Sequence, residues 1–294
     1  DIRYLWELNR HHELVTLAQA WYLTGDERYA IGCQRLLGSW IDECPYGIGP
    51  NWSSALEVAI RLTNWAFTWK LLGAGDRTPG ARLDEALRAR WLKSIYQHCY
   101  FIARYLSQHS SANNHLLGEY MGLFVGAVVW PLWTRSQGWL ETGKNGMEIE
   151  ARKQIAPDGV NLEQAIWYQH EVADMLLVSA LIGRANGIEF SREYWQRIEA
   201  MLEFVASIMD AGGHVPSIGD SDDGVVIRFV PRRPRREAQA GEGAALEMED
   251  RAGIDVFRSL LCTGATLFQR GDFKRKAGSF DAKTRWLLGD AAAI

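Results

Sequence analysis

The feature that most constrains the fold is a helical period of apolar residues, which runs through nearly the whole chain before Gly212. Apolar side chains that recur every three to four residues indicate amphipathic helices rather than strands. Short turns containing Gly or Pro interrupt the pattern, and helices joined in this way form antiparallel pairs. The predicted helices are 3–23, 27–44, 53–72, 81–107, 114–130, 140–155, 161–186 and 191–209.

The pattern changes after Gly212, where glycines and prolines predict loops and residues 225–230 predict a short strand. Residues 232–245 contain Pro, Arg, Glu, Gly and Ala without a core-forming period, and the arginines at 232–236 favour a solvated surface loop, with a clamp for an anionic polymer as the alternative. Helices are expected again over 246–269 and 282–288. We therefore predict an all-α chain, an incomplete α/α toroid of antiparallel helix pairs, as one domain with a polar insertion at about 212–245.

Composition narrows the class of protein. Of the 294 residues, 47% are hydrophobic and 23% are charged, as in soluble globular proteins. The net charge of -4 argues against a nucleic-acid binder, and no apolar run predicts a membrane span. The 13 Trp and 10 Tyr either fill a helical core or line a groove for sugar rings. The four cysteines lack metal-type spacing and favour lone core thiols. Disulfides are the alternative, which leaves the redox compartment open.

Polar residues open an otherwise apolar helix in the stretch "HSSANNHLLGEYMGLFVGAVVWP". The N–H groups and dipole at a helix N-terminus attract carboxylate or sulfate, and Asn114 adds an amide donor. His115 and Glu119 are four residues apart, so that we expect Glu119 to orient the imidazole. The alternative is a capped helix with an interior histidine.

A second group of polar residues lies in "PDGVNLEQAIWYQHEVADMLL". A capping-box pattern from Asn161 to Gln164 predicts the helix start there. Gln164 and Tyr168 would then share one helical face, and Tyr168 could serve as a general acid or base. The alternative is an ordinary amphipathic helix with Tyr168 at the edge of the core.

Aromatic and charged residues pair at helical spacing in two further segments. Trp6 lies four residues before Arg10, and Glu57 lies four before Arg61, in a stretch that also holds Trp52. Such groups stack on sugar rings and bind their acids. Exposed pairs of this spacing are also common on helices without any function.

Acidic residues crowd the glycine loop "GDSDDG" at 219–224. Such a loop binds Ca²⁺ or Mg²⁺ in some proteins, and Asp220 with Asp222 also fits the D-x-D-D string of proton-initiated terpene cyclases. A turn with solvated carboxylates is the simpler interpretation.

Together these segments resemble the helical domain of the heparinase II/III-type polysaccharide lyases, which include heparin, heparan sulfate and alginate lyases. The resemblance rests on "WELNR", "WSSALEVAIR", "NNHLLGE", "DGVNLEQ" with Tyr168, "PSIGDSDDG" and "SLLCTGATLFQRGDF". It implies an incomplete toroid followed by a β-sandwich domain, which would lie after residue 294. One departure is that many relatives have Tyr-His, whereas here Gln169 follows Tyr168 and the histidine comes at 170.

The resemblance implies β-elimination on a uronic-acid polysaccharide, with Asn114, His115 and Tyr168 as catalytic residues and no metal or cofactor. We expect substrate contacts from Trp6, Arg10, Trp52, Arg61, Glu119 and Gln164. A glycoside hydrolase using two carboxylates, for example Glu57 and Asp220, and a non-catalytic glycan-binding scaffold are the alternatives. Both chain ends are expected to be cut from a longer polypeptide. A periplasmic or secreted location is expected, with the cytoplasm as the alternative.

Overall fold

The computed structural model describes residues 2–74, 83–220, 224–229 and 255–290, which are mainly helical and contain no strand. One isolated β-bridge joins Ile155 to Asn161. The all-α prediction is therefore confirmed for these residues, whereas the strand predicted at 225–230 is wrong over the described positions 225–229. No helix in the described ranges has the length and apolar character needed to cross a membrane.

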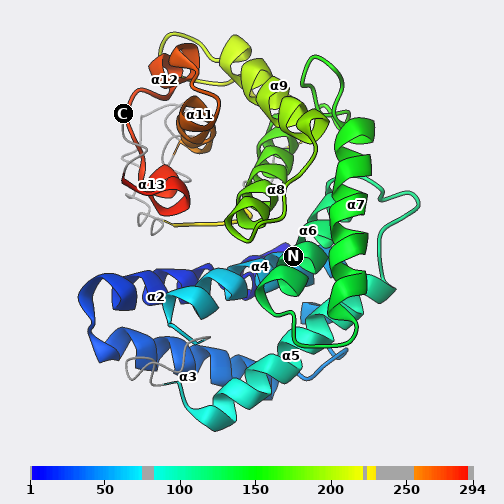
Figure 1. The fold of residues 1–294 in the computed structure, drawn as a ribbon, viewed down its shortest axis with the longest axis vertical. Helices are drawn as coiled ribbons and strands as arrows, with labels where there is room; N and C mark the ends of the chain where they lie inside the picture. The colour runs from blue at the N-terminus through cyan, green and yellow to red at the C-terminus, as the bar shows by residue number, and fades with distance from the viewer. Residues whose placement is uncertain (1, 75–82, 221–223, 230–254, 291–294) are drawn as a thin grey trace, which may run out of the picture. The chain divides into compact units, whose positions relative to one another are not determined.

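The chain divides into two compact units, and the first contains residues 1–149 and 178–190. Its helices lie side by side as hairpins in Figure 1, for example α2 with α3. The elements are α1 (Ile2–Asn9), α2 (His12–Thr24), α3 (Glu27–Glu43), the 3-10 helix η1 (Pro50–Trp52), α4 (Ala55–Leu71), α5 (Glu85–Arg104), α6 (Asn114–Val129), the first part of α7 (Ser136–Gln154) and the last part of α8 (Ile166–Ala185).

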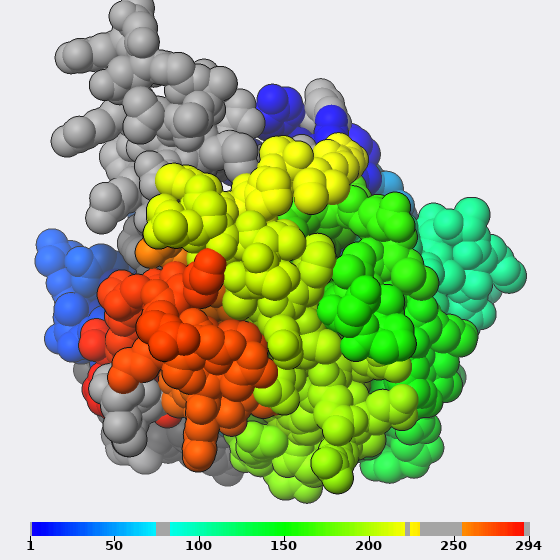
Figure 2. Space-filling model, turned by 90° about the horizontal axis from the view of Figure 1, so that it is seen from above, coloured from blue at the N-terminus to red at the C-terminus, as the bar shows by residue number. Residues whose placement is uncertain are grey.

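The second unit contains residues 150–177 and 191–294. It includes the rest of α7 and α8 with α9 (Arg192–Ile208), α11 (Val256–Leu267), α12 (Gly271–Ala277) and α13 (Ala282–Leu288). Helix α12 packs on α9, and the orange atoms of α12 adjoin the yellow-green atoms of α9 in Figure 2. Arg270 joins the two helices through Glu199, 3.0 Å away. A buried ion pair between Lys283 and Asp174 joins α13 to α8.

Several predicted helices have different bounds in the structure, and for two of them local contacts accompany the difference. The single helix predicted over 3–23 breaks into α1 and α2 at His11, whose φ of 61° is left-handed. That conformation costs about 1–2 kcal/mol, but it lets His11 Nδ1 accept a hydrogen bond of 2.8 Å from the Trp65 indole. The helix predicted from Asn161 begins at Ile166 instead. Asn161 caps a turn by accepting the Glu163 N–H, so the predicted capping box is wrong.

The tryptophans are mainly core residues. Trp65, Trp91 and Trp130 are fully buried, and Trp65 contacts Trp91 edge to face. These tryptophans therefore fill the helical core, as one of the two interpretations of the aromatic content predicts. The cysteines are free thiols, and three of the four are buried.

The one-domain description with an insertion at 212–245 stays a prediction, because residues 230–254 lie outside the described part of the chain. The arginine cluster at 232–236 and Asp222 lie outside it as well. Residues 256–267 of the predicted helix 246–269 form α11, and 282–288 form α13 as predicted.

Candidate functional site

The first part of the candidate site is the N-terminus of α6, which begins at Asn114 as the sequence predicts. Asn113 is the N-cap residue, and its side chain accepts a 3.1 Å hydrogen bond from the His115 N–H. Asn114 is 4% exposed, and His115 is half-buried. The polar opening of this apolar helix therefore includes a cap at Asn113, whereas Asn114 is a buried amide beside the positive end of the helix dipole.

Glu119 does not orient His115, contrary to expectation. One of its carboxylate oxygens accepts the Ser107 N–H at 2.6 Å, and the other accepts the Ser107 hydroxyl at 2.7 Å. Burial raises the pKa of Glu119 to about 7, against the opposing effect of the two Ser107 hydrogen bonds. Because Glu119 is 1% exposed, we interpret it as a support for the segment before α6 rather than as a sugar contact.

The packing of α6 on α4 shows which residues lie at the same height as Asn114 along the axes of these two helices. A Cβ atom on Gly122 would lie 2.5 Å from the Cβ of Ala59, and one on Gly126 would lie 3.1 Å from Leu62. The paired positions advance together, so the two helices run parallel. Asn114 precedes Gly122 by as many residues as Asn51 precedes Ala59. The N-terminus of α6 and the 3-10 helix η1 are therefore at the same end of this helix pair.

Arg10 is paired with Glu57 at this end of α4. Its guanidinium donates to both carboxylate oxygens, at 2.9 and 2.7 Å, and both side chains are buried. The sequence spacing places Glu57 beside Arg61, and the Glu57 charge does act on Arg61, but the residue that donates hydrogen bonds to the Glu57 carboxylate is Arg10. Trp6 is half-exposed, and its indole donates to the Pro50 carbonyl at 3.1 Å.

Arg61 lies inside the unit rather than on a groove. It is 1% exposed and donates to the carbonyls of Asn9 and Asn51 and to His98 Nε2, at 3.2, 2.9 and 3.0 Å. Its guanidinium lies 5.7 Å from the ring centroid of the buried Trp52. Burial lowers the pKa of Arg61 to about 9, opposed by the Glu57 charge. A substrate contact by Arg61 or Trp52 stays a prediction, but their burial argues for a structural role.

His98 is a member of this network that the sequence did not single out. Its Nδ1 lies 2.7 Å from the Ser94 carbonyl, so Nδ1 carries the proton and Nε2 accepts from Arg61. Burial, and then the charge of Arg61, lower the pKa of His98 well below its usual value. No local pattern marks this residue, because its partner lies on another helix.

The second unit holds the other predicted catalytic residue, Tyr168, in the first turn of α8. Tyr168 is half-buried, and its hydroxyl donates to Oδ2 of Asp220 at 3.1 Å. Gln164 precedes the helix with a φ of 56°, so the shared helical face predicted for Gln164 and Tyr168 is wrong. The sequence spacing did not identify Asp220 as the hydrogen-bond partner of Tyr168, and the structure adds it as a functional candidate.

The family model described as "Heparinase II/III N-terminus" matches residues 1–230, which include all of the predicted site residues. The chain belongs to the heparinase II/III family. A heparin-sulfate lyase from Pedobacter heparinus is 28% identical over 226 residues, which cover 74% of this chain and 32% of that protein. A heparin-sulfate lyase from Bacteroides stercoris is 24% identical, over 69% of this chain and 33% of the relative.

Solved structures of the family support the same fold. A crystal structure of the heparan sulfate lyase HepC from Pedobacter heparinus matches with a TM-score of 0.57 at 24% identity, over 71% of this chain and 33% of that one. A crystal structure of heparinase III matches with a TM-score of 0.59 at 19% identity, over 69% and 30%. The predicted fold class, an incomplete α/α toroid, is confirmed. The chain spans about a third of the length of the curated relatives it matches.

This heparinase-family chain has a histidine at 170 rather than directly after Tyr168, and His170 is an interior residue. It is 1% exposed and contacts the rings of Trp167 and Phe257. Burial lowers the pKa of His170 to about 4, so that the imidazole is neutral at pH 7. A neutral ring enclosed by aromatic side chains has a packing role.

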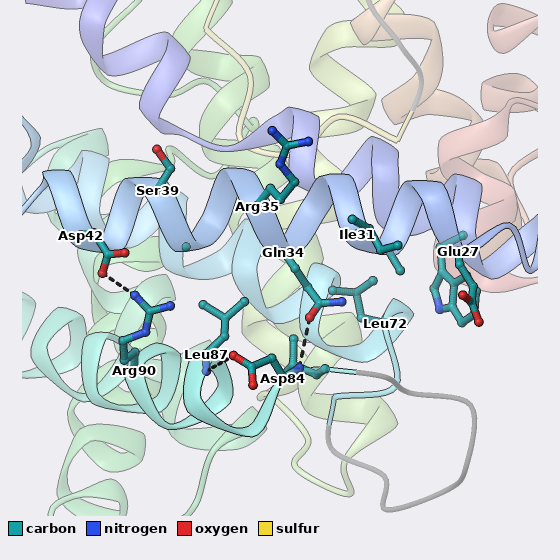
Figure 3. Close-up of a pocket in the computed structure, with 14 residues that line it drawn as sticks. Glu27, Ile31, Gln34, Arg35, Ser39, Asp42, Leu72, Asp84, Leu87 and Arg90 are labelled. Carbon is teal, nitrogen blue, oxygen red and sulfur yellow. Dashed lines mark hydrogen bonds and ion pairs between the residues drawn. The ribbon is translucent and has the colours of Figure 1, made fainter.

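A pocket of about 560 Å³ lies elsewhere in the first unit, between α3 and the start of α5 (Figure 3). Arg90 forms an ion pair with Asp42 across it, and the Asp84 N–H donates to Gln34 at 3.1 Å. Leu72 and Leu87 supply apolar lining. None of the predicted catalytic or substrate-binding residues lines this pocket, so it is separate from the candidate site.

Proposed function

We propose that this chain forms the helical part of a polysaccharide lyase that cleaves a uronic-acid polymer by β-elimination. The observation that carries the proposal is the family match over residues 1–230, which includes both Asn114 and Tyr168. The relatives are named heparin-sulfate lyases, so a heparin- or heparan-sulfate-like polymer is the first substrate class and an alginate-like polymer is the second.

The reaction removes the C5 proton of a uronic acid, next to a carboxylate that resists further negative charge. The electrons of the C5–H bond form the C4–C5 double bond, the C4–O bond breaks, and the leaving glycosidic oxygen takes a proton. Electrons and protons balance in this step, so the proposed reaction requires no oxidant or reductant.

Asn114 is the proposed donor to the uronate carboxylate. Charge develops on that carboxylate as the C5 proton leaves, and a pre-placed amide stabilises it more in the transition state than in the ground state. The burial of Asn114 reduces screening by water, and the N-terminus of α6 adds the positive end of its dipole. The side chain and the helix end therefore favour the same charge.

Tyr168 is proposed to take the C5 proton, to protonate the leaving oxygen, or to do both, with His115 as the alternative base. Trp6 and Arg10 are the proposed sugar contacts, and the half-exposed Trp6 ring is the better placed of the two for stacking.

A β-sandwich domain in the same polypeptide is the proposed partner that completes the site, since the chain spans about a third of the length of its relatives. A periplasmic or secreted location is proposed because the substrate class is an extracellular acidic polymer. The glycoside hydrolase alternative is weaker, because both carboxylate oxygens of Glu57 accept hydrogen bonds from Arg10.

The test is a screen of the natural polypeptide that contains residues 1–294 on heparin, heparan sulfate, alginate, hyaluronan and chondroitin. A lyase leaves a C4–C5 double bond, which absorbs ultraviolet light, whereas a hydrolase leaves only new reducing ends. We expect both new reducing ends and absorbance on at least one polymer. Reducing ends without absorbance would support a hydrolase, and binding without either product would support a non-catalytic scaffold.

A further inference from the structure

The segment before Asp220 is fixed against the start of α8. The Ile166 N–H donates to the Ile218 carbonyl at 2.9 Å, which satisfies one of the N–H groups that a helix start leaves without an intrahelical partner. Gly219 has a φ of 73°, and a Cβ atom there would lie 2.7 Å from both the Cα of Ala165 and the carbonyl oxygen of Gln164. Only glycine allows this approach.

The close approach determines where the next residue lies. Asp220 follows Gly219 directly, and Tyr168 lies two residues after Ile166 on the helix to which the segment is held. The Tyr168 hydroxyl donates to Asp220 Oδ2 at 3.1 Å, although the two residues are 52 positions apart in the chain. Three contacts therefore hold the segment 218–220 against the start of α8. They are the backbone hydrogen bond at Ile218, the close packing of Gly219, and the side-chain hydrogen bond from Tyr168 to Asp220.

We propose that Asp220 is a positioning residue for Tyr168, which holds the phenol hydroxyl in the orientation that proton transfer requires. The proposal rests on the lyase function proposed above, and it goes beyond that function by giving a role to the glycine loop. A half-exposed tyrosine has a hydroxyl that rotates, and a misplacement of about 1 Å in a reacting group costs about 100-fold in rate. The charged acceptor reduces that freedom.

Asp220 orients the protonated phenol and does not itself react, so its role applies to the step in which Tyr168 gives its proton to the leaving glycosidic oxygen. This predicts that Asp220 affects turnover more than substrate affinity, and that its effect depends on the Tyr168 hydroxyl. A hydrogen bond to a charged group contributes about 1.5–3 kcal/mol, which corresponds to a loss of roughly 10-fold to 150-fold in kcat.

The test is a double-mutant cycle in the natural polypeptide, with Asp220→Ala, Tyr168→Phe and the double variant assayed for unsaturated product. Asp220→Ala should lower kcat by roughly 10-fold or more with KM changed less than about two-fold, and should have little further effect in the Tyr168→Phe background. The matched control is Asp158→Asn, which removes an exposed carboxylate of the same unit. Gly219→Ala should reproduce the loss, because the added Cβ pushes the segment off α8.

An unchanged kcat in Asp220→Ala, an equal loss in the Tyr168→Phe background, or an equal loss in Asp158→Asn would overturn the proposal. A readout without activity separates it from the lyase function. With 3-fluorotyrosine at position 168, the fluorine resonance should move in Asp220→Asn and not in Asp158→Asn. If the wild type forms no unsaturated product, the lyase proposal fails, and an unmoved resonance would show that the contact itself is absent.

Discussion

Replacing Arg10 by Met is expected to destabilise the chain more than any exposed charge substitution. Arg10 is bound at both carboxylate oxygens of Glu57, with side-chain exposures of 10% and 5%. Removing one partner of a buried ion pair leaves the other charge uncompensated, which costs about 3–5 kcal/mol. Arg61 also interacts with the charge of Glu57, so the expected cost is at the lower end, about 3 kcal/mol.

The assay is urea unfolding followed by tryptophan fluorescence, since buried tryptophans lie near the pair. The matched control is Arg28→Met, which breaks an ion pair with Asp26 in which the arginine side chain is 85% exposed. Such exposed pairs contribute little to stability, because water and salt screen the charges. Arg10→Lys should fall between the two, because lysine keeps the charge and loses the two-point geometry. A cost for Arg10→Met no larger than that for Arg28→Met would refute the reasoning.

Three further predictions concern pH, packing and the isolated chain. The pKa of Glu119 is raised from 4.5 to about 7, so the folded state binds its proton more tightly, and its contribution to the free energy of unfolding should be present below pH 4.5 and lost as pH rises towards 7. Urea unfolding at pH 5 and pH 7 should show less of this loss in Glu119→Gln, and an identical pH dependence in both proteins would contradict the assignment. Gly122→Ala should cost about 1–3 kcal/mol from overpacking against Ala59, whereas the control Gly138→Ala, which has open space, should be neutral or stabilising in the same assay. The 294-residue chain alone should bind acidic oligosaccharide weakly, lose that binding in salt, and form far less unsaturated product than the natural polypeptide, and equal turnover would mean that every catalytic group lies within residues 1–294.

The local sequence pattern predicted the bounds of a helix well where no distant residue affects them. The helix expected over 114–130 is α6, Asn114–Val129, because an apolar run between a polar start and Pro131 has one stable solution. The break at His11 was missed because it depends on a hydrogen bond from Trp65, which is 54 residues away. A periodic pattern contains no information about such a partner.

The candidate site was predictable in its residue types and less so in its contacts. Asn114 begins a helix as expected, but Glu119 binds Ser107 instead of His115, because the segment before α6 returns to the same side of the helix. Spacing of four residues placed Glu57 with Arg61, whereas the hydrogen bonds to Glu57 come from Arg10, in the turn between α1 and α2. Pairs formed between distant segments, including Tyr168 with Asp220, are set by tertiary packing and leave no local signal.

The most direct test of the central claim is the initial rate of unsaturated-product formation on heparan sulfate, or on whichever polymer the screen selects, by the natural polypeptide and its Asn114→Ala and Tyr168→Phe variants. Asn145→Ala and Tyr4→Phe are the matched controls, because both residues are exposed on helices of the first unit. Loss of a donor at a charge-developing oxygen costs roughly 3–4 kcal/mol, so Asn114→Ala should lower kcat by about 100-fold to 1000-fold at unchanged stability. Tyr168→Phe should lower kcat by roughly 100-fold to 10,000-fold, to a residual rate that can still be measured, with both controls near the wild-type rate. Wild-type rates in Asn114→Ala or Tyr168→Phe, in proteins that unfold at the same urea concentration as the parent, would contradict the account.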